Sequence, residues 1–226
     1  MESWSTTRTF VTMAAAGVVL ASILTARFGS GRLAWLFGPV PDPIGVALVT
    51  GVGWYALQSI IRRGWIGDRP GYLLAVVAAT ALAVVVVAVD LTIPFSEDTN
   101  RPWPESILYY PTVAVVAEVA FRIVPLAVLL ALTGWRFDPG GGFERRVMTA
   151  LVAVALIEVV FQVLASVGGG DDQRLLPFVA VHLAVFGIVE LGLLRHSGLS
   201  VMLTFRLTYY LWWHIVWGHF RLSMLF

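Results

Sequence analysis

The sequence predicts an all-α fold, a polytopic transmembrane helix bundle with about seven spans. Of its 226 residues, 58% are hydrophobic and only 13% are charged. The mean hydropathy is +0.84. Soluble domains average about half apolar and about a quarter charged residues, so this composition is typical of a membrane protein. Apolar stretches of helical length recur along the whole chain, which indicates several spans rather than one anchor.

A helix needs about 20 mostly apolar residues to cross the hydrocarbon core, where backbone polar groups must bond to one another. This length predicts spans at residues 10–26, 44–61, 72–90, 107–133, 147–166, 175–194 and 199–220. The first follows Arg8, and we interpret it as a retained span rather than a signal peptide, because no soluble domain follows it. Pro39, Pro41 and Pro43 then predict an interfacial connection, since closely spaced prolines cannot continue a helix. We expect one integral-membrane domain over 1–226.

The loops predict the orientation, because basic residues accumulate in cytoplasmic loops. All fifteen basic residues are Arg. The N-terminal side holds Arg8, Arg62, Arg63, Arg69, Arg136, Arg145, Arg146 and Arg195, and the opposite side holds Arg27, Arg32, Arg101, Arg174 and Arg221. We therefore predict an integral protein of the cell membrane, in contact with the lipid bilayer, whose N-terminus is cytoplasmic.

The absence of two residue types excludes several function classes. Without Lys there is no retinal or pyridoxal Schiff base and no phosphate-loop lysine. Without Cys there are no disulfides, thiolate nucleophiles or iron–sulfur ligands. A formal charge of +1 argues against a nucleic-acid partner. Chemistry inside the spans is left to Glu, His, Arg and Tyr.

Several ionisable residues fall inside the predicted spans. Each Glu or Arg there costs about 2.5–3.5 kcal/mol on insertion scales, so each is by default a functional hypothesis. They are Glu118, Arg122, Glu158, His182, Glu190, Arg206 and His214. The alternative is structural pairing, because Glu118 and Arg122 are four residues apart on one helix. Arg206 could likewise pair across the bundle with Glu158 or Glu190.

Two local patterns point to a polar interior. Pro125 removes the donor for the carbonyl of Phe121, so the fourth span should kink there. Helical spacing places Arg206, Tyr210 and His214 along one stripe of the last span. We expect that stripe to face the bundle interior, although aromatic neighbours make an interfacial position for His214 the alternative.

Residues 117–122, Ala-Glu-Val-Ala-Phe-Arg, resemble the first motif of the CAAX protease and bacteriocin-processing family of intramembrane proteases, which is two glutamates, three residues and Arg. The approach at 106–111 and the late segment 191–200 are also similar, so the resemblance covers about 105–215. It implies that a glutamate and histidines on neighbouring helices activate a water, with or without metal, to cleave peptide bonds near the membrane surface.

The sequence departs from the family at the catalytic positions. Ala117 replaces the first glutamate of the pair. The second motif, Phe followed four residues later by His, falls at Phe161 and Ala165, whereas a literal match occurs one helix later at Phe178 and His182.

The third motif, His followed four residues later by Asn, falls at Arg206 and Tyr210. An Arg neither ligates metal nor accepts a proton. These losses favour a degenerate member, a pseudoenzyme that serves as a membrane scaffold or binds a peptide or another membrane protein.

Two alternatives remain open. The first is an active intramembrane endopeptidase, with Glu118 as base, Arg122 or Arg206 stabilising an oxyanion, and His182 and His214 as ligands of water or zinc. The second is a subunit that binds haem, a pigment or a quinone, for which His182 and His214 would be axial ligands.

Overall fold

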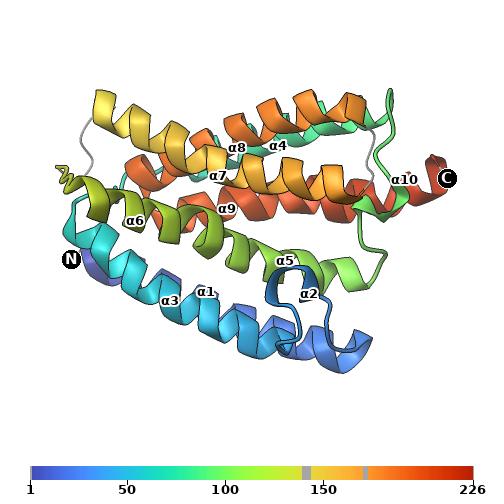
Figure 1. The fold of residues 1–226 in the computed structure, drawn as a ribbon, viewed down its shortest axis with the longest axis horizontal. Helices are drawn as coiled ribbons and strands as arrows, with labels where there is room; N and C mark the ends of the chain where they lie inside the picture. Colours follow the sequence, from blue (N-terminus) through green and yellow to red (C-terminus); the bar gives the residue numbers. More distant parts are fainter. Residues whose placement is uncertain (1, 139–143, 170–172, 226) are drawn as a thin grey trace.

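The structure, a computed structural model, describes residues 2–138, 144–169 and 173–225, and these residues form a bundle of helices joined by loops (Figure 1). Its α-helices are α1 (Glu2–Phe28), α2 (Ala34–Phe37), α3 (Asp42–Arg62), α4 (Tyr72–Asp90), α5 (Glu105–Glu118), α6 (Val124–Thr133), α7 (Arg145–Gly169), α8 (Leu176–Ser197), α9 (Leu199–Tyr210) and α10 (Gly218–Met224). The π-helical segments are η2 (Val119–Ile123) and η4 (Leu211–Trp217), and the 3₁₀ turns are η1 (Glu97–Thr99) and η3 (Gln173–Leu175). The predicted all-α class is confirmed.

Within the described residues, six helices are long and apolar enough to cross a membrane, which fits an integral membrane protein. They are Ser5–Phe28, Asp42–Arg62, Tyr72–Asp90, Glu105–Thr133, Arg145–Ser166 and Gln173–Ser197. The seventh predicted span, 199–220, is helical throughout, but the π-helical η4 divides it into the shorter helices α9 and α10. Six of the seven predicted spans are therefore long, apolar helices, and the last is an interrupted one.

The long helices run back and forth between the two ends of the bundle, so the N-terminus and the C-terminus lie at opposite ends (Figure 1). α1 packs against α3 and α5, and α8 packs against α7 and α9. α4 lies along α9, and α5 also contacts α9, which joins the two sets of helices. Helices α5, α7, α8 and α9 thus surround the centre of the bundle.

Close packing at η2 fixes the centre of the fourth span. A Cβ added at Gly53 of α3 would lie 2.6 Å from Cγ1 of Val119, so only glycine lets α3 approach η2 this closely. The kink predicted at Pro125 stays a prediction, and the π-helical turn η2 ends two residues before that proline. The carbonyl of Phe121, which Pro125 deprives of its helical donor, accepts a hydrogen bond from Nη1 of Arg122 at 3.1 Å.

Candidate functional site: a buried charge cluster beneath an aromatic cavity

Five charged side chains meet in the centre of the bundle, and we call them the charge cluster: Glu118, Arg122, Glu158, Glu190 and Arg206. They come from α5, η2, α7, α8 and α9. All five are buried, and Glu118, Arg122 and Glu190 are completely inaccessible to solvent. The cluster therefore ties together the four helices that surround the centre.

Arg122 and Arg206 share two of the carboxylates. Arg122 donates from Nε to Glu190 at 2.8 Å and from Nη2 to Glu158. Arg206 donates from Nη2 to Oε2 of Glu190 at 2.6 Å and from Nη1 to Oε1 of Glu158 at 3.3 Å. The predicted pairing of Arg206 with Glu158 or Glu190 is confirmed for both.

Their spacing suggests an ion pair between Glu118 and Arg122, but each of them pairs with residues of other helices instead. Oε1 of Glu118 accepts a hydrogen bond from Nε of Arg206 at 2.9 Å, whereas Arg122 turns to Glu158 and Glu190. The π-helical η2 begins directly after Glu118 and changes the direction of Arg122 relative to an ordinary α-helical turn.

The charge cluster contains more acid than base. Its three carboxylates and two guanidinium groups have a formal charge of −1 if all are ionised, because Arg keeps its charge. Oε2 of Glu118 is buried and has no hydrogen-bond partner among the described residues.

Gly187 of α8 makes room for Arg122. A Cβ at Gly187 would lie 2.9 Å from Cβ of Ala155 and 3.0 Å from Nη2 of Arg122. Only the missing side chain allows α7 and α8 to close around the guanidinium group.

A cavity of about 580 Å³ lies next to the charge cluster, toward the end of the bundle that holds the C-terminus. This volume is within the range of about 300–1,000 Å³ that is usual for ligand pockets. Glu158 and Arg206 form its polar floor. Much of the wall is aromatic: Trp35, Phe95, Tyr109, Tyr110, Phe161, Phe178, Phe186, Tyr209, Tyr210 and Trp213.

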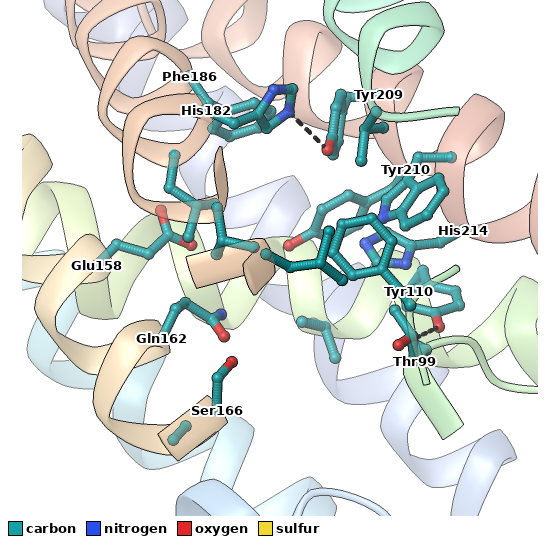
Figure 2. A pocket seen from close by; sticks show the side chains of 18 of the residues that line it. Thr99, Tyr110, Glu158, Gln162, Ser166, His182, Phe186, Tyr209, Tyr210 and His214 are labelled. Atoms are coloured by element: carbon teal, nitrogen blue, oxygen red, sulfur yellow. Dashed lines mark hydrogen bonds between the residues drawn. The ribbon is translucent and has the colours of Figure 1, made fainter. Parts of the chain in front are cut away.

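One wall of the cavity carries a polar stripe along α7. Glu158, Gln162 and Ser166 are spaced four residues apart and therefore project from one face of the helix. Figure 2 shows all three side chains on the same side of α7, opposite Tyr210 and His214. The stripe leads from the charge cluster toward the loop end of the cavity and supplies hydrogen-bonding groups along its length.

The short helix α2 covers the cavity between α5 and α7. Nε1 of Trp35 donates to the hydroxyl of Tyr109 on α5 at 3.0 Å, and its ring lies 6.1 Å from that of Phe161 on α7. The carboxylate of Asp42 fixes the preceding loop by accepting hydrogen bonds from the backbone N–H groups of Arg32 and Leu33. α2 ends at Phe37, before Pro39 and Pro41, whereas Pro43 lies in the first turn of α3.

The two histidines line the cavity but have separate partners. Nε2 of His182 lies 2.9 Å from the hydroxyl of Tyr209 (Figure 2). Nδ1 of His214 lies 2.8 Å from Oδ1 of Asn100, and its ring stacks on Tyr110 with centroids 4.2 Å apart. Among the described residues, no group of three or more His, Cys, Asp or Glu could hold a metal ion. The side chains present thus do not fit the zinc site that the two-histidine hypothesis requires.

The structure brings together most of the residues that the sequence singles out. Glu118, Glu158, Glu190 and both arginines form one cluster, and Arg206, Tyr210 and His214 all line the cavity. Sequence reasoning missed Gln162 and Ser166, although their spacing from Glu158 was a visible signal. It also missed Trp35 on the short helix α2 and Asn100 in the segment before α5, which reach the site by tertiary packing.

The chain matches no family model, no curated protein and no solved structure in comparisons with known proteins.

Proposed function

We propose that this protein is a membrane-embedded peptide-binding protein, a degenerate relative of the CAAX protease and bacteriocin-processing family that binds without hydrolysis. The observation that carries the proposal is the aromatic cavity of about 580 Å³ whose floor is a charge cluster of paired carboxylates and guanidinium groups. Aromatic walls suit side chains, and the polar stripe on α7 suits the N–H and C=O groups of a short peptide.

The family assignment is supported by the convergence of its motif positions. Glu118 and Arg122 come from the first motif, and Arg206 and Tyr210 occupy the third. Arg206 contacts Glu118 at 2.9 Å and Tyr210 at 3.1 Å, so positions nearly 90 residues apart meet in one network. A degenerate site that keeps its place in the fold would look like this.

The absence of hydrolysis is supported by the contacts of the carboxylates. A general base must reach the water from which it takes a proton. Glu118 faces Arg206, and the described residues that line the cavity include Glu158 but not Glu118. Glu158 itself accepts hydrogen bonds from both arginines. Neither carboxylate has the geometry of a free base.

The excess of Arg at the N-terminal end supports an orientation in the cell membrane with a cytoplasmic N-terminus. The cavity lies toward the opposite end and is lined by Ser96, Thr99 and Arg101 of the loop between α4 and α5. In this orientation the protein binds its peptide from the outer side of the membrane.

A synthetic pool of random tetrapeptides tests the proposal. The purified full-length protein is incubated with the pool, separated by gel filtration, and both fractions are analysed by mass spectrometry. We expect a subset of intact peptides to remain with the protein. In the Ser166→Trp variant the bulky side chain fills the cavity, so retention should fall to background.

The matched control is Leu164→Trp, two residues away on the exposed face of α7, which should retain the same peptides. Cleaved peptides would overturn the proposal in favour of an active endopeptidase. Failure of the wild-type protein to retain any peptide would overturn the peptide class, and a visible absorption band would favour a haem or pigment.

A further inference from the structure

A second pocket lies at the end of the bundle that holds the N-terminus, far from the aromatic cavity. Its volume is about 330 Å³, and it is lined by Ser59, Arg62, Arg63 and Arg136. The first three belong to the end of α3 or directly follow it, and Arg136 belongs to the segment after α6. Three guanidinium groups and one hydroxyl thus converge, all of them hydrogen-bond donors.

The segment after α6 is fixed in place beside α3. Nη1 of Arg63 donates to the carbonyl of Trp135 at 3.3 Å, and the backbone N–H of Phe137 donates to the carbonyl of Arg63 at 2.8 Å. Nη2 of the buried Arg195 donates to the carbonyl of Asp138 at 2.8 Å. These bonds hold the backbone on either side of Arg136 beside the end of α3, so the fold brings the two segments that form the pocket together.

Among the described residues, no ion pair neutralises Arg62 or Arg136 of this pocket. Arg62 and Arg136 are exposed, and in the part of the chain that the structure describes no carboxylate lies within 4.0 Å of either guanidinium group. Planar guanidinium groups match the oxygens of a phosphate in geometry as well as in charge. The complementary ligand is therefore a phosphate group.

An apolar surface continues from the pocket along the same two helices. Val52 and Tyr55 share one stripe of α3 with Ser59, and their side chains are 58% and 78% exposed. On α6, Val128 is 51% and Leu132 82% exposed. α3 and α6 pack side by side. The exposed apolar side chains therefore form a surface on the outside of the bundle that leads away from the arginines along the two helices.

We propose that this pocket binds the phosphate headgroup of an anionic phospholipid, whose acyl chains lie along the exposed apolar faces of α3 and α6. The charged pocket and the apolar surface together have the amphipathic shape of a lipid. The half-buried Trp135, which packs at 6.5 Å from Phe137, has the position that Trp favours at the membrane interface. The proposal is independent of peptide binding, because the two pockets share no residue.

Native mass spectrometry of the full-length protein in detergent tests the proposal. Phosphatidylglycerol and phosphatidylcholine with the same acyl chains are titrated separately, and the affinity is taken from the populations of lipid adducts. We expect tighter binding of phosphatidylglycerol. The double variant Arg62→Gln/Arg136→Gln should weaken that binding about thirtyfold. It should weaken phosphatidylcholine binding much less, because the choline of that lipid offsets the charge of its phosphate.

The matched control is Arg145→Gln/Arg146→Gln, which removes the same charge from exposed residues at the same end of the bundle and should leave both affinities unchanged. Equal loss in this control would reduce the effect to bulk electrostatics and overturn the site. Equal affinity of the wild-type protein for the two lipids would also overturn it. Displacement of phosphatidylglycerol by millimolar inorganic phosphate would show a site for free phosphate instead of a lipid.

Discussion

Arg122 and Arg206 carry permanent charges although their side chains are almost completely buried, and the surrounding side chains pair with most of their guanidinium nitrogens. Both Nε and Nη2 of Arg206 bond to carboxylate oxygens, and Nη1 also reaches the hydroxyl of Tyr210. Removing one member of a buried ion pair typically costs about 3–5 kcal/mol, because the partner is left charged and alone. The charge cluster is therefore a strong constraint on which sequences can form this centre.

Gly187 offers a test of that constraint that leaves every charge in place. In Gly187→Ala the new methyl group would lie within 3.0 Å of Arg122 and within 2.9 Å of Ala155, so the guanidinium group or α7 must move. We expect the free energy of unfolding to fall by about 1–3 kcal/mol, which is the usual cost of overpacking. Thermal or denaturant unfolding of the purified protein measures it.

Gly51→Ala is the matched control, because nothing lies within 4 Å of the added Cβ on the exposed face of α3. It should be neutral or slightly stabilising, since Ala is the better helix former. Equal losses in both variants would mean that Gly187 has no special relation to Arg122.

At the scale of single residues, the sequence predicts which ionisable side chains are important better than it predicts which of them form ion pairs with each other. The cost of insertion singles out Glu118, Arg122, Glu158, Glu190 and Arg206 without any structure. Spacing along one helix suggests Glu118 with Arg122, but partner choice is decided by η2 and by the approach of α7, α8 and α9. Those distances are set by tertiary packing, which the spacing of residues in the chain does not encode.

Among the helices, α7 shows most directly how one element serves two environments. The stripe of Glu158, Gln162 and Ser166 faces the cavity, whereas Leu164 is 68% exposed on the outside of the bundle. A difference of two residues turns a side chain to nearly the opposite face of an α-helix. This arrangement predicts that one face of α7 contacts water in the cavity and the opposite face contacts lipid.

Cysteine labelling tests the two faces of α7, and the chain has no native Cys to interfere. Maleimides react with the thiolate, which forms in water and not in hydrocarbon. We expect a water-soluble maleimide to modify Ser166→Cys at least about tenfold faster than Leu164→Cys in membranes. The rates are followed by the mass shift of the labelled protein.

Denatured samples of both variants should label equally fast, which controls for the intrinsic reactivity of the two thiols. Faster labelling of Leu164→Cys in the membrane would mean that the outer face of α7 meets water, and the assignment of a hydrated cavity on the other face would then be wrong.

The element boundaries follow from local chemistry where a proline or a glycine decides them. Pro125 predicts a kink in the fourth span, and the helix there changes to the π-helical η2 two residues before that proline. The π-helical η4 contains no proline, but α10 begins directly after it at Gly218. A Cβ added at Gly218 would lie 2.8 Å from Nδ2 of Asn100, so the loop before α5 approaches the last span closely where η4 ends.

For the whole molecule, composition and span length are enough to predict an all-α membrane bundle, because the bilayer permits few alternatives to helices. The cavity is not predictable in the same way. Its walls come from residues as distant in sequence as Trp35 and Trp213, which only tertiary packing brings to one cavity. The pattern of residues along the chain does not encode the volume of such a cavity.

The number of membrane crossings makes a prediction about the two termini. The N-terminus and the C-terminus lie at opposite ends of the bundle (Figure 1), which requires the segment 199–224 to cross although η4 divides it. Its interior face carries Arg206, which is fully paired, so the interruption does not expose a bare charge to lipid. We therefore expect reporters fused to the two termini to lie on opposite sides of the membrane.

Two reporters distinguish the sides, each fused in turn to either terminus. One is a fluorescent protein that folds only in the cytoplasm, and the other is a phosphatase that is active only outside it. Reporters in the α3–α4 and α4–α5 loops serve as controls, because the long helix α4 separates them. Termini on the same side would mean that only six helices cross and that the polar stripe of α9 enters the membrane without spanning it.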